Sequence, residues 1–250
     1  MKRMKGIWIG LLGTGLLLAS AFVSSLNKNL QVRATALPAT TRPVVILDPG
    51  HGGPDGGASS NGVLEKEINL KIAQKTRDIC RFFGFTVVMT RDSDVSIHDS
   101  GASSVRSQKV SDLRNRLGMM VETPGALVVS IHLNKFPQSY VHGPQVFYAP
   151  RTPDSQDLAQ MVQDNLEQHL EADRQRSIKK ADSSLFLLYN NEVNPAILVE
   201  CGFISNPEEA EKLKDEAYQD KIAMSICYTL MKFNSRGDEI TDGNNQSAQS

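Results

Sequence analysis

The sequence predicts a single α/β domain, in which a mostly parallel, twisted sheet of about six strands carries helices on both faces. Two observations support this prediction. Short apolar or β-branched runs alternate along the chain with longer segments of helical periodicity, and this alternation is typical of α/β folds. The chain has 250 residues, which is enough for one substantial domain but too few for two of ordinary size.

The expected strands are short runs rich in valine, isoleucine and leucine, separated from one another by polar residues, glycine or proline. Because β-branched and apolar side chains pack well on a pleated surface, we assign these runs to the sheet. They cover residues 44–47, 85–89, 127–131, 145–148, 185–188 and 196–199.

The expected helices lie between these strands. In the first of them, Ile72, Ile79 and Phe82 fall near one side, as in an amphipathic helix. The last helix has a clear start, because Asn206 is a favoured N-cap residue and Pro207 is a favoured first residue. The helical segments cover residues 65–82, 104–121, 155–170 and 207–233.

The two ends of the chain differ from this domain. A basic start is followed by a stretch that reaches residue 23 without any charge, so we expect residues 1–26 to be a signal sequence or an N-terminal membrane anchor. Its basic end would stay inside the cell, and the rest would be exported. Residues 27–42 are expected to be a linker. The domain is expected to span residues 43–233, and residues 234–250 lack apolar periodicity and are expected to be a disordered tail.

Composition excludes several classes of function. The net charge is −1, whereas a nucleic-acid-binding domain would show a basic surplus, so we expect no nucleic-acid partner. The three cysteines, Cys80, Cys201 and Cys227, have no CxxC spacing. This argues against a disulfide scaffold and against a thiolate zinc site, and we expect each cysteine to be a small buried residue.

A glycine-rich segment follows the first expected strand. Residues 48–62 contain six glycines and two prolines, a composition that is incompatible with regular secondary structure. The segment lacks the Lys-Ser/Thr ending of a phosphate-binding loop and the GxGxxG spacing of a dinucleotide fold. It carries His51 and ends at Glu65, where a helix is expected to begin. We therefore expect it to bend the chain between these two side chains.

Two further polar residues end apolar strands. His132 ends the run 127–131, and Glu200 ends the run 196–199. Because ligands of open α/β sheets collect at the carboxyl ends of the strands, we expect His51, His132 and Glu200 to share one edge, with Glu65 folded back to join them. Two imidazoles and a carboxylate suit zinc, and a further carboxylate that is not a ligand can take a proton from water.

Each of these residues also has a simpler explanation. A single histidine at a strand end is usually a hydrogen-bonded structural residue. Glu65 alone would be a carboxylate favoured by the helix dipole. Glu200 could form a buried ion pair with Arg91 or Arg116. The remaining histidines lie in polar or charged stretches and are expected to be solvated; they are His98, His142 and His169.

Four strings carry a resemblance to a known family. They are VVILDPGHGG (44–53), LEKEINL (64–70), VSIHLN (129–134) and ILVECGFISNP (197–207). In their order and spacing they resemble the zinc-dependent N-acetylmuramoyl-L-alanine amidases of bacterial cell walls, of the amidase_3 type. The resemblance implies that His51, Glu65 and His132 hold one Zn²⁺ per chain and that Glu200 is the catalytic carboxylate. It also matches Arg116 to an arginine of the family.

The resemblance implies hydrolysis of the amide between N-acetylmuramic acid and L-alanine of the peptidoglycan stem peptide. The continuation PDGGA (54–58) and the string SIHLNKFP (130–137) are most similar to the membrane-anchored sporulation amidase, which enables muramic-δ-lactam formation in the spore cortex before germination. Its place would be the outer face of the cytoplasmic membrane, the wall space or the forespore intermembrane space. A vegetative cell-separation amidase, a wall zinc peptidase and a catalytically silent wall-binding protein stay open, as does a protein activator or a downstream deacetylase partner.

Overall fold

The computed structural model describes residues 42–172 and 175–247, with the backbone alone over 237–247. The expected signal or anchor segment, 1–26, and all but the last residue of the expected linker, 27–42, lie outside the described residues.

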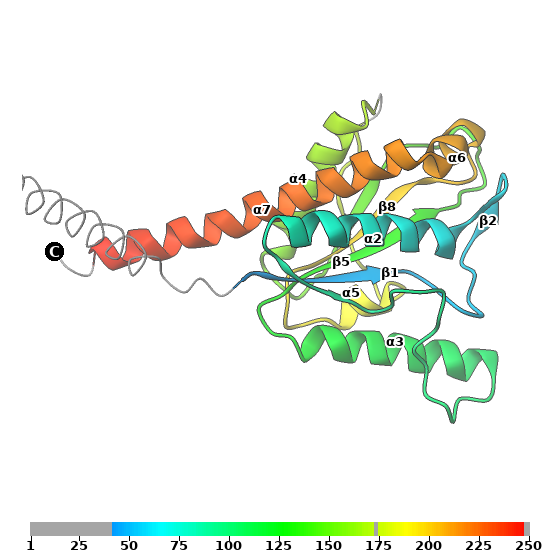
Figure 1. Cartoon of the computed structure of the whole chain (residues 1–250), viewed down its shortest axis with the longest axis horizontal. Coiled ribbons are helices and arrows are strands. Elements are labelled where there is room, and N and C mark those ends of the chain that lie inside the picture. Colours follow the sequence, from blue (N-terminus) through cyan, green and yellow to red (C-terminus); the bar gives the residue numbers. More distant parts are fainter. Residues whose placement is uncertain (1–41, 173–174, 248–250) are drawn as a thin grey trace, which may run out of the picture. The chain divides into compact units, whose positions relative to one another are not determined.

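A six-stranded sheet forms the centre of the fold and confirms the predicted class (Figure 1). All neighbouring strands are parallel except β6 and β8, which pair antiparallel. In spatial order the strands are β4 (Thr86–Met89), β1 (Val44–Pro49), β5 (Leu127–Asn134), β8 (Ala196–Phe203), β6 (Gln145–Tyr148) and β7 (Lys179–Lys180). A small hairpin of β2 (Ser59–Ser60) and β3 (Val63–Leu64) stands apart from the sheet.

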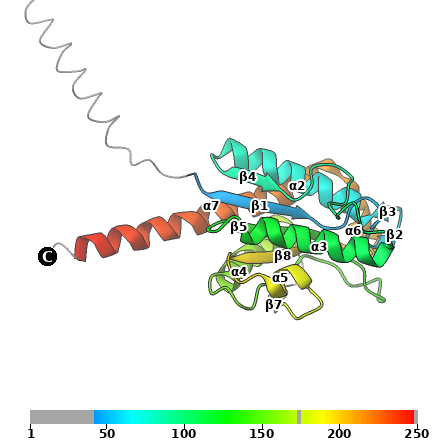
Figure 2. The same cartoon turned by 90° about the horizontal axis from the view of Figure 1, so that it is seen from below.

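Helices cover both faces because the strands alternate their apolar side chains. Val45 and Leu47 of β1 enter one core cluster, whereas Ile46 enters the other. The first cluster packs under α2 (Glu65–Phe82), α4 (Ser155–His169) and α7 (Glu216–Ser247). The second packs under α3 (Val105–Val121) and α5 (Phe186–Asn190), as Figure 2 shows from below. The remaining helix, α6 (Pro207–Lys214), contacts α7 and β8.

The prediction of a strand at 185–188 is wrong, because residues 186–188 belong to the short helix α5 and Leu185 is its N-cap. A turn begins the helix: the backbone N–H of Leu185 donates to the carbonyl of Asp182, and that of Ser184 donates to the Asp182 carboxylate. Leu188 is buried under the sheet in this conformation. A short apolar run does not distinguish a strand from a buried helical turn. The sixth strand is β7, two exposed lysines at the sheet edge.

The predicted helix 207–233 is divided in two. Asp215 leaves the helical conformation after α6, and its carboxylate accepts the backbone N–H of Tyr218 in the first turn of α7. Local side-chain capping of this kind begins a new helix. Helix α7 then runs on to Ser247, through most of the segment 234–250 for which the sequence predicts a disordered tail.

Phe82 differs from its prediction as well. The buried stripe of α2 passes through Ile72, Thr76 and Cys80. Phe82 stands two positions after Cys80, which is about 200° around the helix. Its side chain is therefore 84% exposed instead of lying on the apolar side with Ile72.

Candidate metal centre

Three of the four predicted residues come together at the carboxyl edge of the sheet. His51 follows β1, Glu65 is the first residue of α2, and His132 lies near the end of β5. Each offers one ligand atom, and these atoms all lie within 4.8 Å of one another. Oε1 of Glu65 is 3.1 Å from Nε2 of His51 and 3.0 Å from Nδ1 of His132. The remaining histidines, His98, His142 and His169, do not belong to this cluster.

Glycines permit this close approach. A Cβ atom on Gly50 would lie 2.2 Å from the ring of His132, and one on Gly57 would lie 2.6 Å from the carboxylate of Glu65. Both distances are too short for any side chain. His51 itself has a φ of 63°, in the left-handed region that non-glycine residues seldom adopt. The glycine-rich segment therefore brings His51 and Glu65 together by letting backbone pass directly beside the ligand side chains.

Two buried arginines hold the backbone around His51. Arg116 donates to the carbonyl of His51 at 2.7 Å and to the carboxylate of Asp48 at 2.8 Å. Arg91 donates to the carbonyls of Pro49 and Gly50 at 3.0 and 2.9 Å. Burial opposes the charge of Asp48, but Arg116 and two hydroxyl donors keep the pKa of this carboxyl below its usual value. The arginines thus fix the strand end that presents His51.

The alternative role for these arginines, as partners of Glu200, is not observed. Within residues 42–172 and 175–247, no ion pair joins Glu200 to Arg91 or Arg116. The charge of Arg116 is instead satisfied by Asp48 and by Asp112, whose carboxylate is 2.7 Å from Nε of the guanidinium.

Asp55 is a residue of the site that the sequence did not identify. Its Oδ2 lies 3.1 Å from Nδ1 of His51 and 3.1 Å from Nζ of Lys109 on α3. A carboxylate on the far nitrogen of a ligand histidine sets the tautomer and the ring orientation. Burial disfavours a charged imidazole, but Asp55 and Glu65 raise the pKa of His51 to about 9. The two carboxylates therefore favour positive charge at this position. The only sequence signal is an acidic residue four positions after His51.

Glu65 is held as an anion. Its Oε2 accepts the backbone N–H of Ala58 at 2.7 Å, and its Oε1 faces both histidines. Burial raises the pKa of this carboxyl, but the hydrogen bonds and charges of His132 and His51 lower it by a larger amount. The pKa of Glu65 therefore lies well below its usual range. Glu65 thus has the charge and the orientation of a metal ligand.

Glu200 lies beside this cluster in a different environment. It pairs with His132 in the register of β8 and β5, so the two side chains are cross-strand neighbours on one face of the sheet. Its Oε2 is buried and has no hydrogen-bond partner within the described residues. Burial raises the pKa of Glu200 to about 7; the carboxylate of Glu65 adds to the increase, and the two histidines oppose it. A buried carboxylate oxygen without a donor is rare in proteins.

The residues present fit a zinc ion. Two imidazole nitrogens and one carboxylate oxygen form the mixed donor set of hydrolytic zinc sites, which keep a fourth position for water or substrate. Ligands about 2.0–2.1 Å from a tetrahedral zinc stand roughly 3.3 Å apart, close to the 3.0 and 3.1 Å separations between Glu65 and the two histidines. The unpartnered oxygen of Glu200 lies beside this cluster and is free to contact a group bound there.

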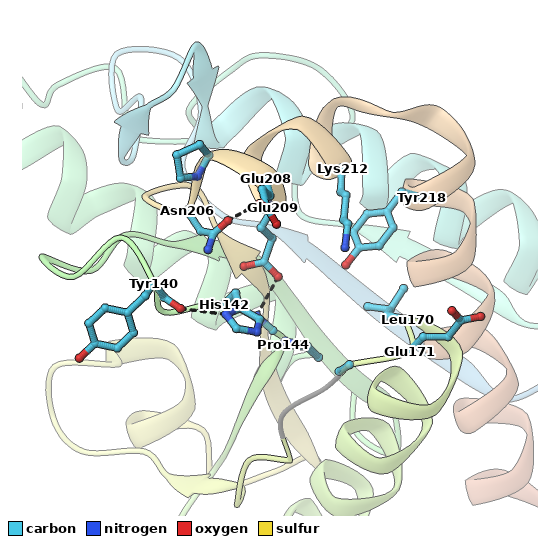
Figure 3. A pocket seen from close by; sticks show the side chains of 13 residues that line it. Tyr140, His142, Pro144, Leu170, Glu171, Asn206, Glu208, Glu209, Lys212 and Tyr218 are labelled. Atoms are coloured by element: carbon cyan, nitrogen blue, oxygen red, sulfur yellow. Dashed lines mark hydrogen bonds between the residues drawn. The ribbon is translucent and has the colours of Figure 1, made fainter.

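A cavity of about 530 Å³ lies elsewhere, between the end of α4, the start of α6 and the loop before β6 (Figure 3). Tyr140, His142, Glu208 and Lys212 are among its lining residues, and none of the four predicted site residues lines it. This cavity is therefore separate from the cluster at the sheet edge.

Comparisons with known proteins agree with this geometry. A sequence model described as N-acetylmuramoyl-L-alanine amidase (Amidase_3) matches residues 45–232. The germination-specific N-acetylmuramoyl-L-alanine amidase of Bacillus subtilis strain 168 is 35% identical over 238 residues, which cover 95% of this chain and 98% of that protein.

Two solved structures are also similar. The CwlD amidase of Clostridioides difficile, solved in complex with the GerS lipoprotein, has a TM-score of 0.74 and 36% identity over 78% of this chain and 99% of that chain. An N-acetylmuramoyl-L-alanine amidase of Clostridium difficile 630 has a TM-score of 0.68 and 29% identity over 78% of this chain and 98% of that chain.

Proposed function

The chain belongs to the N-acetylmuramoyl-L-alanine amidase family and is a peptidoglycan amidase, and from this premise we propose how its residues divide the reaction. His51, Glu65 and His132 hold one zinc ion, and Glu200 is the general base. The bond that is cleaved joins the lactyl group of N-acetylmuramic acid to L-alanine of the stem peptide.

The environment of Glu200 is the observation that carries this assignment. It is the carboxylate beside the cluster whose oxygen has no donor, and burial holds its pKa near neutrality. A general base works best when its pKa lies near the operating pH. Glu65 is unsuited to that role, because its lowered pKa makes it a poor proton acceptor.

The proposed reaction is a hydrolysis in which Glu200 transfers one proton. When bound, zinc supplies Lewis acidity toward the scissile carbonyl and an activated water. Glu200 accepts a proton from the attacking water on its carboxylate and returns it to the nitrogen of L-alanine, so that the amine leaves neutral. Asp55 keeps the ring of His51 oriented during these steps, and Arg116 keeps the backbone of His51 in place.

The biological setting is the spore cortex in this proposal, where removal of stem peptides permits muramic-δ-lactam formation. Its support is the similarity to the germination-specific amidase over 95% of this chain. A structural relative was solved with a lipoprotein, so we include a protein partner of the amidase among the expectations.

Export and membrane attachment belong to the same proposal. Their support is the uncharged stretch that follows the basic N-terminus. Within residues 42–172 and 175–247, no helix is long and apolar enough to cross a membrane.

The test is digestion of purified sacculi and spore cortex by the full chain, followed by mass spectrometry of the products, with and without a chelator. Free, intact stem peptides beginning at L-alanine are expected, and chelation should abolish their release. Products cut within the stem peptide would indicate a wall peptidase instead. No digestion together with no stoichiometric zinc would indicate a silent wall-binding protein.

A further inference from the structure

Two aromatic side chains stand exposed together at the end of α2. Phe82 is 84% exposed and Phe83 is 45% exposed, and their rings meet edge to face with centroids 5.3 Å apart. A single exposed phenylalanine needs no explanation. Two exposed rings in edge-to-face contact form a small apolar projection, which we call the phenylalanine pair.

The phenylalanine pair lies at the amino edge of the sheet. The chain continues from it directly into β4, where the backbone N–H of Thr86 donates to the carbonyl of Pro43 at 3.0 Å. Thr86 also pairs with Val44, the first residue of β1. Figure 1 shows the end of α2 and the start of β1 at the same end of the domain. The chain therefore enters the domain beside the phenylalanine pair.

Exposed cations surround this edge. Arg81 precedes the pair and Arg42 precedes Pro43, and both are exposed. Helix α7 runs in the same direction as α2, because Lys75 pairs with Asp220 at 2.7 Å and, further along, the thiol of Cys80 contacts that of Cys227.

Because α7 runs parallel to α2, two cations of α7 also lie toward the amino edge. The turns of α7 just beyond the level of the phenylalanine pair carry Lys232 and Arg236, which are exposed. The nearest exposed acid on α2, Asp78, is already paired with Arg77 at 2.8 Å. The edge thus combines an apolar projection with four exposed cations, Arg42, Arg81, Lys232 and Arg236, and the next acids of α7 follow further along that helix, from Asp238 onward.

The metal cluster occupies the opposite edge. β5 begins at Leu127 near the amino edge and reaches His132 five residues later. At about 3.3 Å per residue, this places the cluster roughly 15–20 Å from the amino edge. The two edges face in opposite directions, because the strands that connect them are parallel.

We propose that the phenylalanine pair is a membrane-contact patch, which enters the headgroup region of an anionic bilayer and points the metal edge away from the membrane, toward the wall. The proposal rests on the membrane attachment proposed above, since about forty residues that include the uncharged stretch precede Arg42. Aromatic rings favour the membrane interface, and exposed arginine and lysine are attracted to anionic lipid. A tether that leaves from the same edge raises the effective concentration of lipid at the pair.

The test places a fluorescent reporter at each edge of the full chain. Trp8 is the only tryptophan, so the background is Trp8→Phe, with Phe82→Trp or Phe83→Trp as the reporter. The matched control is Phe136→Trp, because Phe136 is 47% exposed and follows β5 at the metal edge. Each protein is reconstituted in phosphatidylglycerol/phosphatidylcholine vesicles whose acyl chains are brominated near the headgroup.

The expected result is at least twofold quenching of the tryptophan emission of the Phe82→Trp or Phe83→Trp protein by the brominated lipid, with no change for the control. Replacing phosphatidylglycerol with phosphatidylcholine should reduce this quenching. Equal quenching of the two reporters in vesicle-bound protein would overturn the membrane-contact patch while leaving the membrane attachment intact. A partner protein would then be the better occupant of the phenylalanine pair. Failure of the full chain to sediment with vesicles would overturn the attachment and the patch together. Release of stem peptides by each variant verifies its fold.

Discussion

Glu65 is buried and Glu200 half-buried beside the same two histidines, and their surroundings shift the pKa values of the two carboxyls in opposite directions. Glu65 accepts a backbone N–H and contacts both imidazoles, so its pKa is lowered. Glu200 has an oxygen without any donor, and burial raises its pKa to about 7. The comparison shows that hydrogen bonds and neighbouring charges, not residue type, set the pKa values of the two glutamates apart, as the proposed division into a ligand and a base requires.

The strongest test of this comparison is Glu200→Gln. The substitution keeps the shape of the side chain but removes its basicity, and loss of a general base commonly costs about 10²–10⁴-fold in turnover. We expect a loss of this size in stem-peptide release, with zinc content unchanged by elemental analysis. Glu208→Gln, on the exposed side of α6, is the control and should retain activity. Parental turnover in the Glu200 variant would remove it from the mechanism.

The companion variant, Glu65→Gln, should fail for a different reason. A neutral amide is a weak zinc ligand, so we expect zinc affinity to fall by more than the roughly 10–100-fold typical of a lost outer contact. Competition with a chromophoric chelator measures the affinity. Excess zinc should restore part of the activity of this variant, but none of the activity of Glu200→Gln. Equal rescue of both variants would contradict the division of roles.

Asp55→Asn tests whether the contact between Asp55 and His51 serves zinc binding and not the chemical step. We expect zinc affinity to fall about 10–100-fold, because the carboxylate no longer orients the ring, while kcat at saturating zinc changes little. Asp220→Asn is the control, since Asp220 forms an exposed pair with Lys75 but contacts neither His51 nor the glycine-rich segment. A fall in kcat at unchanged zinc affinity would instead place Asp55 in the chemical step.

The pH dependence of turnover tests the raised pKa of Glu200. The carboxylate is the active form, so turnover should fall as the pH drops through the pKa and the base becomes protonated. With a pKa of about 7, the loss approaches tenfold per pH unit below neutrality. A bound cation lowers the pKa, so the acid limb should lie at or below pH 7. A profile that stays flat down to about pH 4, the ordinary range of a glutamate, would show that the pKa of Glu200 is not raised.

Much of the site could be predicted because its residues stand where an apolar run stops or a helix begins, although β5 and β8 continue past His132 and Glu200. His132 and Glu200 follow apolar strand residues in the sequence, and Glu65 begins a helix, so topology alone brings them to one edge. Asp55 and Lys109 could not be predicted, because their contacts depend on how the glycine-rich loop folds across α3.

The limits of prediction elsewhere have similar causes. The sequence predicts a strand at residues 185–188 because a short apolar run has no clear period, and the turn at Asp182 decides in favour of a helix. Periodicity also places Phe82 on the apolar side of α2, but the buried stripe follows Thr76 and Cys80. Its exposure becomes visible only with the packing of α2 on the sheet.

The carbonyl contacts of Arg91 and Arg116 have a consequence for the life history of the protein. The two guanidinium groups hold the backbone carbonyls of residues 49–51 by hydrogen bonds that do not involve a metal ligand atom. In small zinc domains the metal is what folds the chain, whereas here the contacts of the two arginines with the backbone around His51 do not involve a metal ion. For the exported zinc enzyme proposed above, the position of His51 would thus be set by the fold before the metal arrives.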